Sequence, residues 1–509
     1  MNDTNQKIGQ LITNLRQERE MTQTAFAEAL GTSQSAVNRI EKGKQNLSLD
    51  MLARISEVLQ KPLVKVETSG AINLKIEGGH ELKGEITVKT SKNAAVAILC
   101  ASLINYGVTK LKSVARIEEV NRIIEVLQSI GVQIKWLPGN DLEIRRPQKL
   151  LLDKMNENAA RKTRTVIMFV GALMREYPNL RIPYAGGCEL GKRTVLPHIY
   201  ALEEFGAKIE AKTGHYQISG KMHLPNRDIV LYETGDTTTE NALIAAATFE
   251  GETVIKLASS NYMVQDTCLF LQRLGVRIDG IGTPTLRVHG HKYIKKNISY
   301  SPSEDPVEAM TFIAAAITTD SSVTIKRSPI DFLELEMLKL EKMGLKYEVL
   351  SAYKAENGYT NLADIKIYKH GGKLKAPGEK IHPLPSTGLN IDNLPYFVPI
   401  CAVANGRTLI HDWVYEDRAL MFTEIKKIGV ELELADPHRV YVNGPTRWRA
   451  GDVVCPSGIR PAVMLLIGML AAPGKSTLRN IYTINRGYED LASRLNSLGA
   501  RITIQSDIS

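Results

Sequence analysis

One unit recurs six times between residue 90 and the C-terminus, and this repeat constrains the fold more than any other feature of the chain. In each copy a helical pattern ends in an apolar residue followed by glycine, and a strand pattern begins directly after the glycine. Glycine is favoured there because a helix C-terminus often needs a residue in the left-handed conformation. The pattern predicts six copies of a βαβαβ-like unit. The six glycines lie 75, 69, 69, 85 and 70 residues apart: Gly131, Gly206, Gly275, Gly344, Gly429 and Gly499.

A second helical pattern, rich in small residues, precedes each of these glycines. The six segments are residues 94–103, 165–174, 241–248, 310–318, 396–404 and 462–470. They are apolar nearly all round, which is typical of helices that are buried on every side. We therefore expect an α/β (α+β) fold in which sheets enclose inner helices.

The first 67 residues have a different, all-helical pattern. Residues 21–31 predict a helix with Phe26, Ala27 and Leu30 on its apolar face, ended by Gly31. A second helix follows at once, with Ser33 as its predicted N-cap. Two short helices joined by a tight glycine turn form a helix-turn-helix.

This segment resembles the Cro/phage-repressor family, which implies DNA binding through the second helix. Residues 1–67 hold nine Lys and Arg against eight Asp and Glu, a net charge of only +1. Affinity for phosphates depends on an excess of cations, so a module for dimerisation or docking is the alternative. The side chains expected to reach DNA are Gln34, Ser35, Asn38 and Arg39.

Charge and composition favour a water-soluble protein that handles anionic small molecules. The remaining +8 of the net charge of +9 lies beyond residue 67. No apolar run is long enough to span a bilayer and the N-terminus lacks a signal-peptide pattern, so we expect a cytoplasmic protein without membrane contact. Five scattered cysteines form no CxxC pair and the histidines lack metal-ligand spacing, so we expect no metal and no cofactor. Residues 473–477 look like the end of a P-loop, but an apolar helical pattern precedes them where a strand is required.

Residues 184–193 form the segment most suggestive of chemistry. Three glycines allow close approach to a ligand, and Cys188 lies near Lys192 and Arg193. Neighbouring cations lower the pKa of a thiol and increase its nucleophilic character. The alternative is an ordinary exposed thiol on a surface turn.

Three motifs together resemble the enolpyruvyl transferase family. They occupy residues 91–95, 186–193 and 486–489. The resemblance runs from about residue 71 to residue 505 and is strongest to the members that act on UDP-N-acetylglucosamine. It implies a two-domain inverse α/β barrel, with three repeats in each domain and a cleft between them. We expect a helix-turn-helix domain in residues 1–67, one transferase domain in residues 71–91 and 300–509, and the other, with Cys188, in residues 92–299.

The resemblance also implies a reaction and a set of roles. The reaction is transfer of the 1-carboxyvinyl group of phosphoenolpyruvate to the 3-hydroxyl of UDP-N-acetylglucosamine, with release of phosphate, in the first committed step of peptidoglycan synthesis. Lys92 would bind phosphate, Cys188 would act as acid or covalent partner, and Asp305 would be the base on the acceptor hydroxyl. Arg418 would grip the phosphate and carboxylate together with Arg193. The implied substrate-binding residues are Asn93, Arg164, Arg193, Glu308 and Asp392.

These roles suit the chemistry, although single residues have simpler interpretations. A lysine and two arginines fit a substrate with two anionic groups, and loss of the acceptor proton requires a carboxylate within reach. Taken alone, Lys92 is equally typical of a solvated lysine at a helix end. Asp305, followed by proline, is equally typical of a helix N-cap.

Differences from the family gather on the nucleotide side of the expected site. Leu196 replaces an aspartate that contacts uracil, and Glu233 replaces a lysine. The family's patterns are also altered at Gly235 and at Asn261, and Glu341 stands where the cleft has an arginine. Three functions remain open: the peptidoglycan enzyme, an enolpyruvyl transferase with another acceptor, and a transcription regulator whose enzyme-like domain senses a ligand. The acid and base residues argue against sensing alone. The sequence leaves the oligomeric state open.

Overall fold

The computed structural model describes residues 3–19, 21–43, 51, 54–55, 58–59, 72–184, 194–385 and 387–506 of the 509-residue chain. The chain divides into a small unit that ends at Gly70 and a large unit that runs from Ala71 to Asp507. The described residues of the small unit form one hydrophobic core, and those of the large unit form two. Cys188 and Arg193, two of the predicted site residues, lie outside the described residues.

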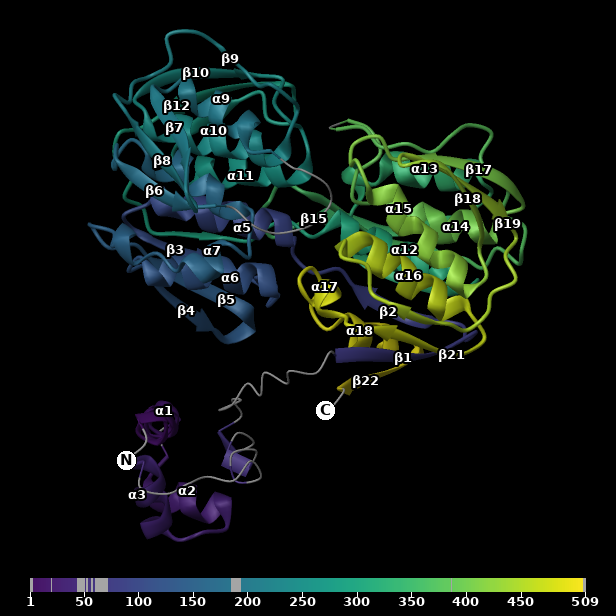
Figure 1. Ribbon diagram of the computed structural model, residues 1–509, viewed down its shortest axis with the longest axis horizontal. Helices are drawn as coiled ribbons and strands as arrows, with labels where there is room; N and C mark the ends of the chain where they lie inside the picture. The colour runs from purple at the N-terminus through teal and green to yellow at the C-terminus, as the bar shows by residue number, and fades with distance from the viewer. Residues whose placement is uncertain are drawn as a thin grey trace. The chain divides into compact units, whose positions relative to one another are not determined.

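The small unit contains the predicted helix-turn-helix. Its helices are α1 (Asp3–Glu18), α2 (Gln23–Leu30) and α3 (Gln34–Glu41) (Figure 1). Ser33 is confirmed as the N-cap of α3, because its Oγ accepts a hydrogen bond from the backbone N–H of Ala36 at 3.3 Å. Gly31 ends α2 with φ of 63°, the left-handed conformation that favours glycine. Phe26 and Leu30 lie in the core as expected.

One polar network joins the three helices of the small unit. The guanidinium of Arg16 in α1 forms an ion pair with Glu41 in α3, and both side chains are buried. The side-chain amide of Gln23 in α2 donates to the same carboxylate at 2.7 Å. A buried charge is costly unless it is paired, so this network favours one arrangement of the three helices.

The described part of the large unit contains six sheets, which confirms the six predicted repeats. The first lobe carries three of them: β13(Ile298–Tyr300)-β3(Val108–Leu111)-β5(Asp141–Arg145)-β4(Gln133–Leu137), β6(Leu180–Pro183)-β8(His215–Gly220)-β7(Ala207–Lys212) and β11(Arg277–Asp279)-β12(Thr285–Gly290)-β10(Gly251–Lys256)-β9(Ile229–Val230). The second lobe carries the others: β15(Tyr347–Lys354)-β16(Asn361–Ile367)-β14(Ser322–Pro329)-β2(Lys83–Thr87), β17(Gly406–His411)-β19(Arg439–Gly444)-β18(Glu431–Asp436) and β20(Asp452–Val454)-β21(Gly474–Arg479)-β1(Ile72–Gly78)-β22(Arg501–Ser506).

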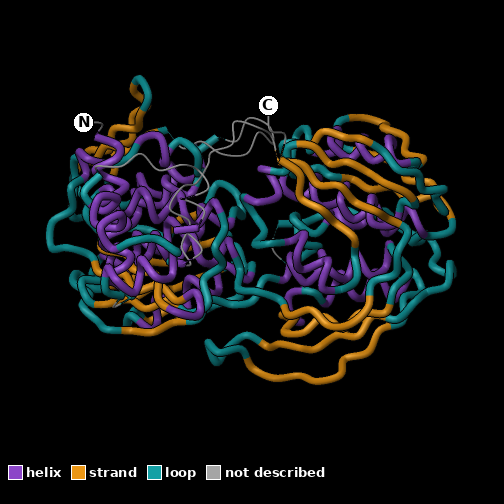
Figure 2. The backbone as a smooth tube through the Cα atoms, turned by 90° about the horizontal axis from the view of Figure 1, so that it is seen from below, coloured by secondary structure: helices purple, strands orange, loops and turns teal. Residues whose placement is uncertain are grey.

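Each lobe encloses apolar helices, as the composition of these segments predicts. The inner helices of the first lobe are α5 (Lys92–Ala101), η4 (Thr165–Met168) with α8 (Phe169–Leu173), and α10 (Asp236–Thr248). Those of the second lobe are α12 (Pro306–Thr318), η6 (Leu394–Tyr396) with α14 (Phe397–Val403), and α16 (Ile459–Ala471). Figure 2 shows strands lying outside these helices, most clearly in the second lobe. Eleven of the thirteen residues of α10 are buried, and all thirteen of α12.

The second helix of each repeat ends at the glycine that marks the repeat. These helices are α6 (Glu118–Ser129), α9 (Leu196–Glu203), α11 (Tyr262–Arg273), α13 (Glu334–Lys342), α15 (Arg418–Phe422) with η7 (Thr423–Ile428), and α18 (Leu491–Ser497). All six repeat glycines have φ between 83° and 103°, which confirms the left-handed conformation expected at these helix ends. Shorter helical turns complete the described chain: η1 (Ser102–Ile104), η2 (Pro138–Asn140), η3 (Leu152–Lys154), α7 (Glu157–Ala160), η5 (Ile330–Phe332) and α17 (Tyr482–Asn485).

The chain crosses between the two lobes twice, and the two crossings lie side by side. β1 and β2 belong to the second lobe, the chain then enters the first lobe at α5, and it returns after β13 to begin α12. The backbone N–H of Ser91 donates to Ser303 at 2.7 Å, and that of Asp305 donates to Lys89 at 2.9 Å. Each crossing ends at a helix N-cap, Ser91 for α5 and Asp305 for α12. The crossover therefore brings the N-termini of two inner helices to the junction of the lobes.

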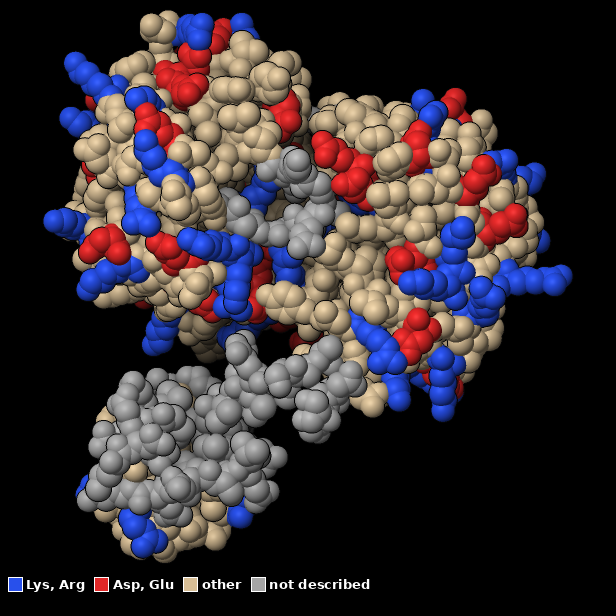
Figure 3. All heavy atoms as spheres, in the orientation of Figure 1, with Lys and Arg blue, Asp and Glu red and all other residues tan. Residues whose placement is uncertain are grey.

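On one face of the large unit, positive charge is spread rather than gathered in one patch. On the face drawn in Figure 3, lysine and arginine side chains alternate with aspartate and glutamate over both lobes. Among the described residues, no helix is long and apolar enough to cross a membrane. The surface on this face therefore shows no broad basic patch.

Candidate functional site

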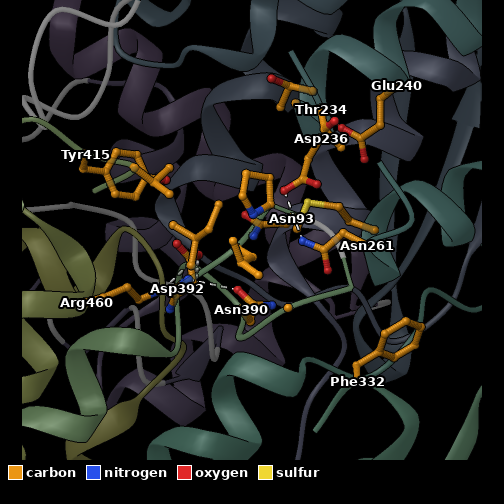
Figure 4. Close-up of a pocket in the computed structure, with 18 of the residues that line it drawn as sticks. Asn93, Thr234, Asp236, Glu240, Asn261, Phe332, Asn390, Asp392, Tyr415 and Arg460 are labelled. Carbon is orange, nitrogen blue, oxygen red and sulfur yellow. Dashed lines mark hydrogen bonds and ion pairs between the residues drawn. The ribbon is translucent and has the colours of Figure 1, made fainter. Parts of the chain in front are cut away.

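The two lobes line one cavity of about 1180 Å³ (Figure 4). Five of the residues that the sequence predicts for the site lie in its wall: Lys92, Asn93 and Arg164 from the first lobe, and Asp392 and Arg418 from the second. These residues are separated by as many as 326 positions in the chain, yet they face one space. The arrangement brings together cations, an amide and a carboxylate.

Lys92 and Asn93 occupy the first turn of α5, directly after the crossover. Ser91 caps this helix and accepts a hydrogen bond from the backbone N–H of Ala94 at 3.3 Å. The side chains of Ser91 and Asn93 both donate to the hydroxyl of Tyr262, at 3.2 and 3.3 Å. Lys92 makes no ion pair with any described residue, so its ammonium is available to an anion at the N-terminus of the helix.

Three arginines of the second lobe line the cavity, and the sequence prediction named only one of them. Arg418 is 1% exposed, donates to Asp412 at 3.0 Å and stacks on Tyr415 with its guanidinium 4.3 Å from the ring centre. Arg460 and Arg486 are the two additional cations. Arg486 lies in the motif at residues 486–489 that resembles the enolpyruvyl transferase family. Arg460 could have been noticed as the one charged residue within an apolar inner helix.

Arg460 holds the cavity carboxylate in place. Its Nε and Nη2 donate to Asp392 at 3.3 and 3.2 Å, and its Nη1 donates to the hydroxyl of Tyr488 at 2.8 Å. Arg486 forms a long ion pair of 3.4 Å with Glu119, which belongs to the first lobe. The cations of the second lobe are thus fixed by neighbours on both sides of the cavity.

The structure separates the three predicted carboxylates. Asp392 lines the cavity with 28% of its side chain exposed. Asp305 is outside the cavity wall and caps α12, where its carboxylate accepts from the backbone N–H of Val307 at 2.8 Å and of Glu308 at 3.3 Å. Burial raises the pKa of Asp305 to about 6, although nearby Arg460 opposes the shift. The helix-cap interpretation of Asp305 is therefore what the local geometry shows.

The side chain of Glu308 also binds groups outside the cavity. Its carboxylate forms an ion pair with Arg494, and it accepts a hydrogen bond from the backbone N–H of Lys89 at 2.7 Å. Glu308 is absent from the cavity wall. Its contacts tie α12 to α18 and to the crossover.

Carboxylates line a second part of the cavity, at the start of α10. Glu233, Asp236 and Glu240 all face the cavity. Asp236 accepts from the hydroxyl of Ser259 at 2.6 Å and from the side-chain amide of Asn261 at 3.1 Å. Burial, followed by the charge of Asp236, raises the pKa of Glu240 well above its usual value. The sequence had marked Glu233, Gly235 and Asn261 as departures from the family, and all three line this part.

Leu196 and Glu341, the other two positions that differ from the family, lie outside the cavity wall. Leu196 begins α9 with 45% of its surface exposed and is absent from the cavity wall. Glu341 lies in α13 beside a separate surface hollow with Tyr347 and Tyr368. Among the described residues, no group of His, Cys, Asp and Glu side chains is placed to hold a metal ion. The chemistry available in the described part of the cavity is that of positioned cations and several carboxylates.

Comparisons with known proteins agree with this arrangement. The family described as EPSP synthase (3-phosphoshikimate 1-carboxyvinyltransferase) matches residues 76–495, and the helix-turn-helix family matches residues 12–66. The UDP-N-acetylglucosamine 1-carboxyvinyltransferase of Bradyrhizobium diazoefficiens is 30% identical over 429 residues, covering 84% of this chain and 96% of that protein. A protein of the same name from Symbiobacterium thermophilum is 30% identical over 438 residues, covering 84% and 94% of the two chains.

Solved structures share the fold of the large unit. The enolpyruvyl transferase NikO from Streptomyces tendae has a TM-score of 0.72 at 21% identity, covering 86% of this chain and 99% of that one. An EPSP synthase from Acinetobacter baumannii has a TM-score of 0.65 at 17% identity, covering 85% and 100%. With six sheets in two lobes, a cavity between them lined by Lys92 and four arginines, and a family match over most of its length, the chain belongs to the EPSP synthase family of enolpyruvyl transferases and carries a helix-turn-helix domain at its N-terminal end.

Proposed function

We propose that the chain moves the 1-carboxyvinyl group of phosphoenolpyruvate to a hydroxyl of a second substrate and releases phosphate. The observation that carries this proposal is that Lys92 of the first lobe faces the same cavity as three arginines of the second lobe. Phosphoenolpyruvate has a phosphate and a carboxylate, and both groups are well matched by lysine and arginine side chains. A cavity that gathers these cations from two lobes can hold the donor and orient it.

The transfer needs one group that gives a proton and one that takes a proton. The methylene carbon of phosphoenolpyruvate gains a proton while the acceptor oxygen bonds to the neighbouring carbon C2 and loses its own. A proton then leaves the new methyl group, the bond from C2 to the phosphate oxygen breaks, and inorganic phosphate departs. One C–O bond forms and one breaks, with no change of oxidation state.

Asp392 is the carboxylate that the geometry favours as the base. It is the predicted carboxylate that lines the cavity, whereas Asp305 caps a helix behind it. A positioned general base contributes roughly 10²–10⁴-fold to a rate. Cys188 is the proposed acid, as the resemblance implies, and it lies outside the described residues.

The acceptor divides the proposal into two forms. In the first form the acceptor is the 3-hydroxyl of UDP-N-acetylglucosamine, the sugar nucleotide named in the curated relatives, and the chain catalyses the first committed step of peptidoglycan synthesis. In the second form the acceptor is another alcohol. The changed residues Glu233, Gly235 and Asn261, all in the cavity wall, favour the second form.

A phosphate-release assay tests the proposal. Purified full-length chain is incubated with phosphoenolpyruvate alone, with UDP-N-acetylglucosamine and with other hydroxyl compounds. We expect phosphate only when an acceptor is present. Activity with UDP-N-acetylglucosamine supports the first form, and activity with another alcohol supports the second. If no acceptor leads to phosphate release, the result would favour a regulator that only senses a ligand.

We also propose that the small unit binds DNA through α3. Gln34, Ser35 and Arg39 are exposed on this helix, and Asn38 is half-buried. Their side chains are able to bond to base edges or phosphates. Selection of bound fragments from a pool of random-sequence DNA tests the proposal, and a chain that enriches no sequence would indicate a docking or dimerisation module instead.

A further inference from the structure

The inner face of α13 carries a glutamate where an apolar residue is expected. Met337 and Leu340 on this face are buried in the core of the second lobe, and Glu336 beside them is 2% exposed. Glu336 forms no ion pair with any lysine, arginine or histidine that the structure describes. Burial raises the pKa of Glu336, and a hydrogen bond from Asn393 opposes the shift. Because burying an unpaired carboxylate is costly, its presence on this face points to a role other than packing.

Glu336 binds the chain on both sides of Asp392, the proposed base. Its Oε1 accepts a hydrogen bond from the backbone N–H of Asn390 at 3.2 Å. The same oxygen accepts from the side-chain amide of Asn393, which is fully buried, at 2.7 Å. Hydrogen bonds to a charged acceptor are stronger than neutral ones. One carboxylate oxygen therefore fixes the residue two positions before Asp392 and the residue directly after it.

Asn390 connects Glu336 to Asp392 directly. Its side-chain oxygen accepts from the backbone N–H of Asp392 at 2.9 Å, and its carbonyl accepts from the backbone N–H of Asn393 at 2.9 Å, which closes a turn. Glu336, Asn390 and Asp392 all line the cavity, and Figure 4 shows the last two next to each other. Arg460 binds the carboxylate of Asp392, whereas Glu336 and Asn390 bind the backbone that carries it.

We propose that Glu336 is a positioning residue, which holds the turn at Asn390–Asn393 so that the carboxylate of Asp392 reaches the acceptor hydroxyl. This inference rests on the proposed function, because it concerns the base of that reaction. A displacement of about 1 Å in a reacting group can lower a rate on the order of 100-fold. In the alternative, Glu336 only stabilises the fold and has no particular effect on proton transfer.

Two substitutions of Glu336 test the role of its carboxylate oxygen in acceptor-dependent phosphate release by the full-length chain. Glu336→Met removes the hydrogen-bond acceptor at similar size, and kcat should fall about 10- to 100-fold while KM for phosphoenolpyruvate changes by less than about threefold. Glu336→Gln keeps an oxygen at the same place, so its kcat should stay within about threefold of the wild type. Glu341→Met is the matched control, because Glu341 is an exposed glutamate of the same helix outside the cavity wall, and its kcat should be unchanged.

A double-mutant cycle separates positioning from a purely structural role. In the Asp392→Asn background the base is already lost, so adding Glu336→Met should lower the remaining rate by less than about twofold. A structural role would lower the rate by the same factor in both backgrounds. Thermal unfolding is measured in parallel. If Glu336→Met does not fold, Asn390→Ala tests the same connection at a half-buried position, and its kcat should fall about tenfold or more.

Three results would overturn the inference: Glu336→Met keeps the kcat of the wild type, Glu336→Gln is as slow as Glu336→Met, or the loss is the same in the Asp392→Asn background. Each of these results leaves an active wild type and so upholds the transferase. Failure of the proposed function looks different, because the wild type itself would then release no phosphate with any acceptor. The positioning role of Glu336 would be refuted together with it.

Discussion

Exchanging the two candidate base residues for asparagine, one at a time, separates their roles. Asp392 lines the cavity and is held by Arg460 at 3.2 and 3.3 Å, whereas Asp305 caps α12 and is 5% exposed. Asparagine removes the charge at either position but keeps an oxygen that can accept a hydrogen bond. The two variants therefore test proton transfer with little change of shape.

The structure allows the size of each effect to be worked out. Loss of a general base lowers kcat by roughly 10²–10⁴-fold, equal to about 3–5 kcal/mol of transition-state stabilisation. Asp392→Asn should show this loss. Its hydrogen bonds from Arg460 weaken but persist, and because Asp392 is partly exposed the free energy of unfolding should fall by only about 1 kcal/mol.

Asp305→Asn should behave differently, because asparagine is as good an N-cap as aspartate. We expect kcat within about tenfold of the wild type, equivalent to about 1.4 kcal/mol. The assay is acceptor-dependent phosphate release at saturating phosphoenolpyruvate, with thermal unfolding measured in parallel. A loss of more than about 100-fold in Asp305→Asn, with Asp392→Asn nearly unaffected, would refute the assignment of the base.

Three further predictions concern other parts of the chain. The pKa of Asp305 is raised in the folded protein to about 6, so folding favours its protonated form and its contribution to stability falls as pH rises from about 4 to 6. The free energy of unfolding of Asp305→Asn should therefore rise relative to that of the wild type across that range, by an amount on the order of 3 kcal/mol at most. Chemical denaturation at pH 4 and pH 7 measures this difference. An equal difference between the two proteins at both pH values would contradict the burial argument. Cys188 should be alkylated by fosfomycin, the epoxide that cysteine-bearing members of the family bind, and mass spectrometry of the wild type and Cys188→Ser checks this; equal labelling of the two proteins would speak against a reactive thiol. Arg39→Ala and Gln34→Ala should each weaken DNA binding in gel shifts by about 5- to 100-fold, since a good base contact contributes about 1–3 kcal/mol. Unchanged gel shifts with both variants would indicate that α3 does not contact DNA.

The repeat, its left-handed glycines and the helix-turn-helix could all be predicted from the sequence. These features are local, because a helix end, a cap or an apolar helix is determined by residues within a few turns of one another. Gly131 and Gly499 adopt the expected φ values, and Ser33 caps the expected helix. The family could be recognised for a related reason, since its motifs are short runs of adjacent residues.

The orientation of the carboxylates was decided only by the tertiary structure. Asp305 and Asp392 both looked like site residues in the sequence, but only Asp392 lies in the cavity wall. Nothing near Asp305 in the sequence distinguishes a cap turned into the protein from a base turned toward a substrate. Which of these two orientations the carboxylate adopts depends on where the second lobe meets the first.

The same limit applies to Arg460 and to the acidic residues Glu233 and Glu240. Arg460 belongs to the site because α16 packs where its first turn reaches Asp392, more than sixty residues earlier in the chain. Glu233 and Glu240 form one acidic wall because α10 starts at the cavity. Local sequence determines which helices form and where they end, whereas the charge pattern of a cavity arises from segments that meet only after the lobes have packed.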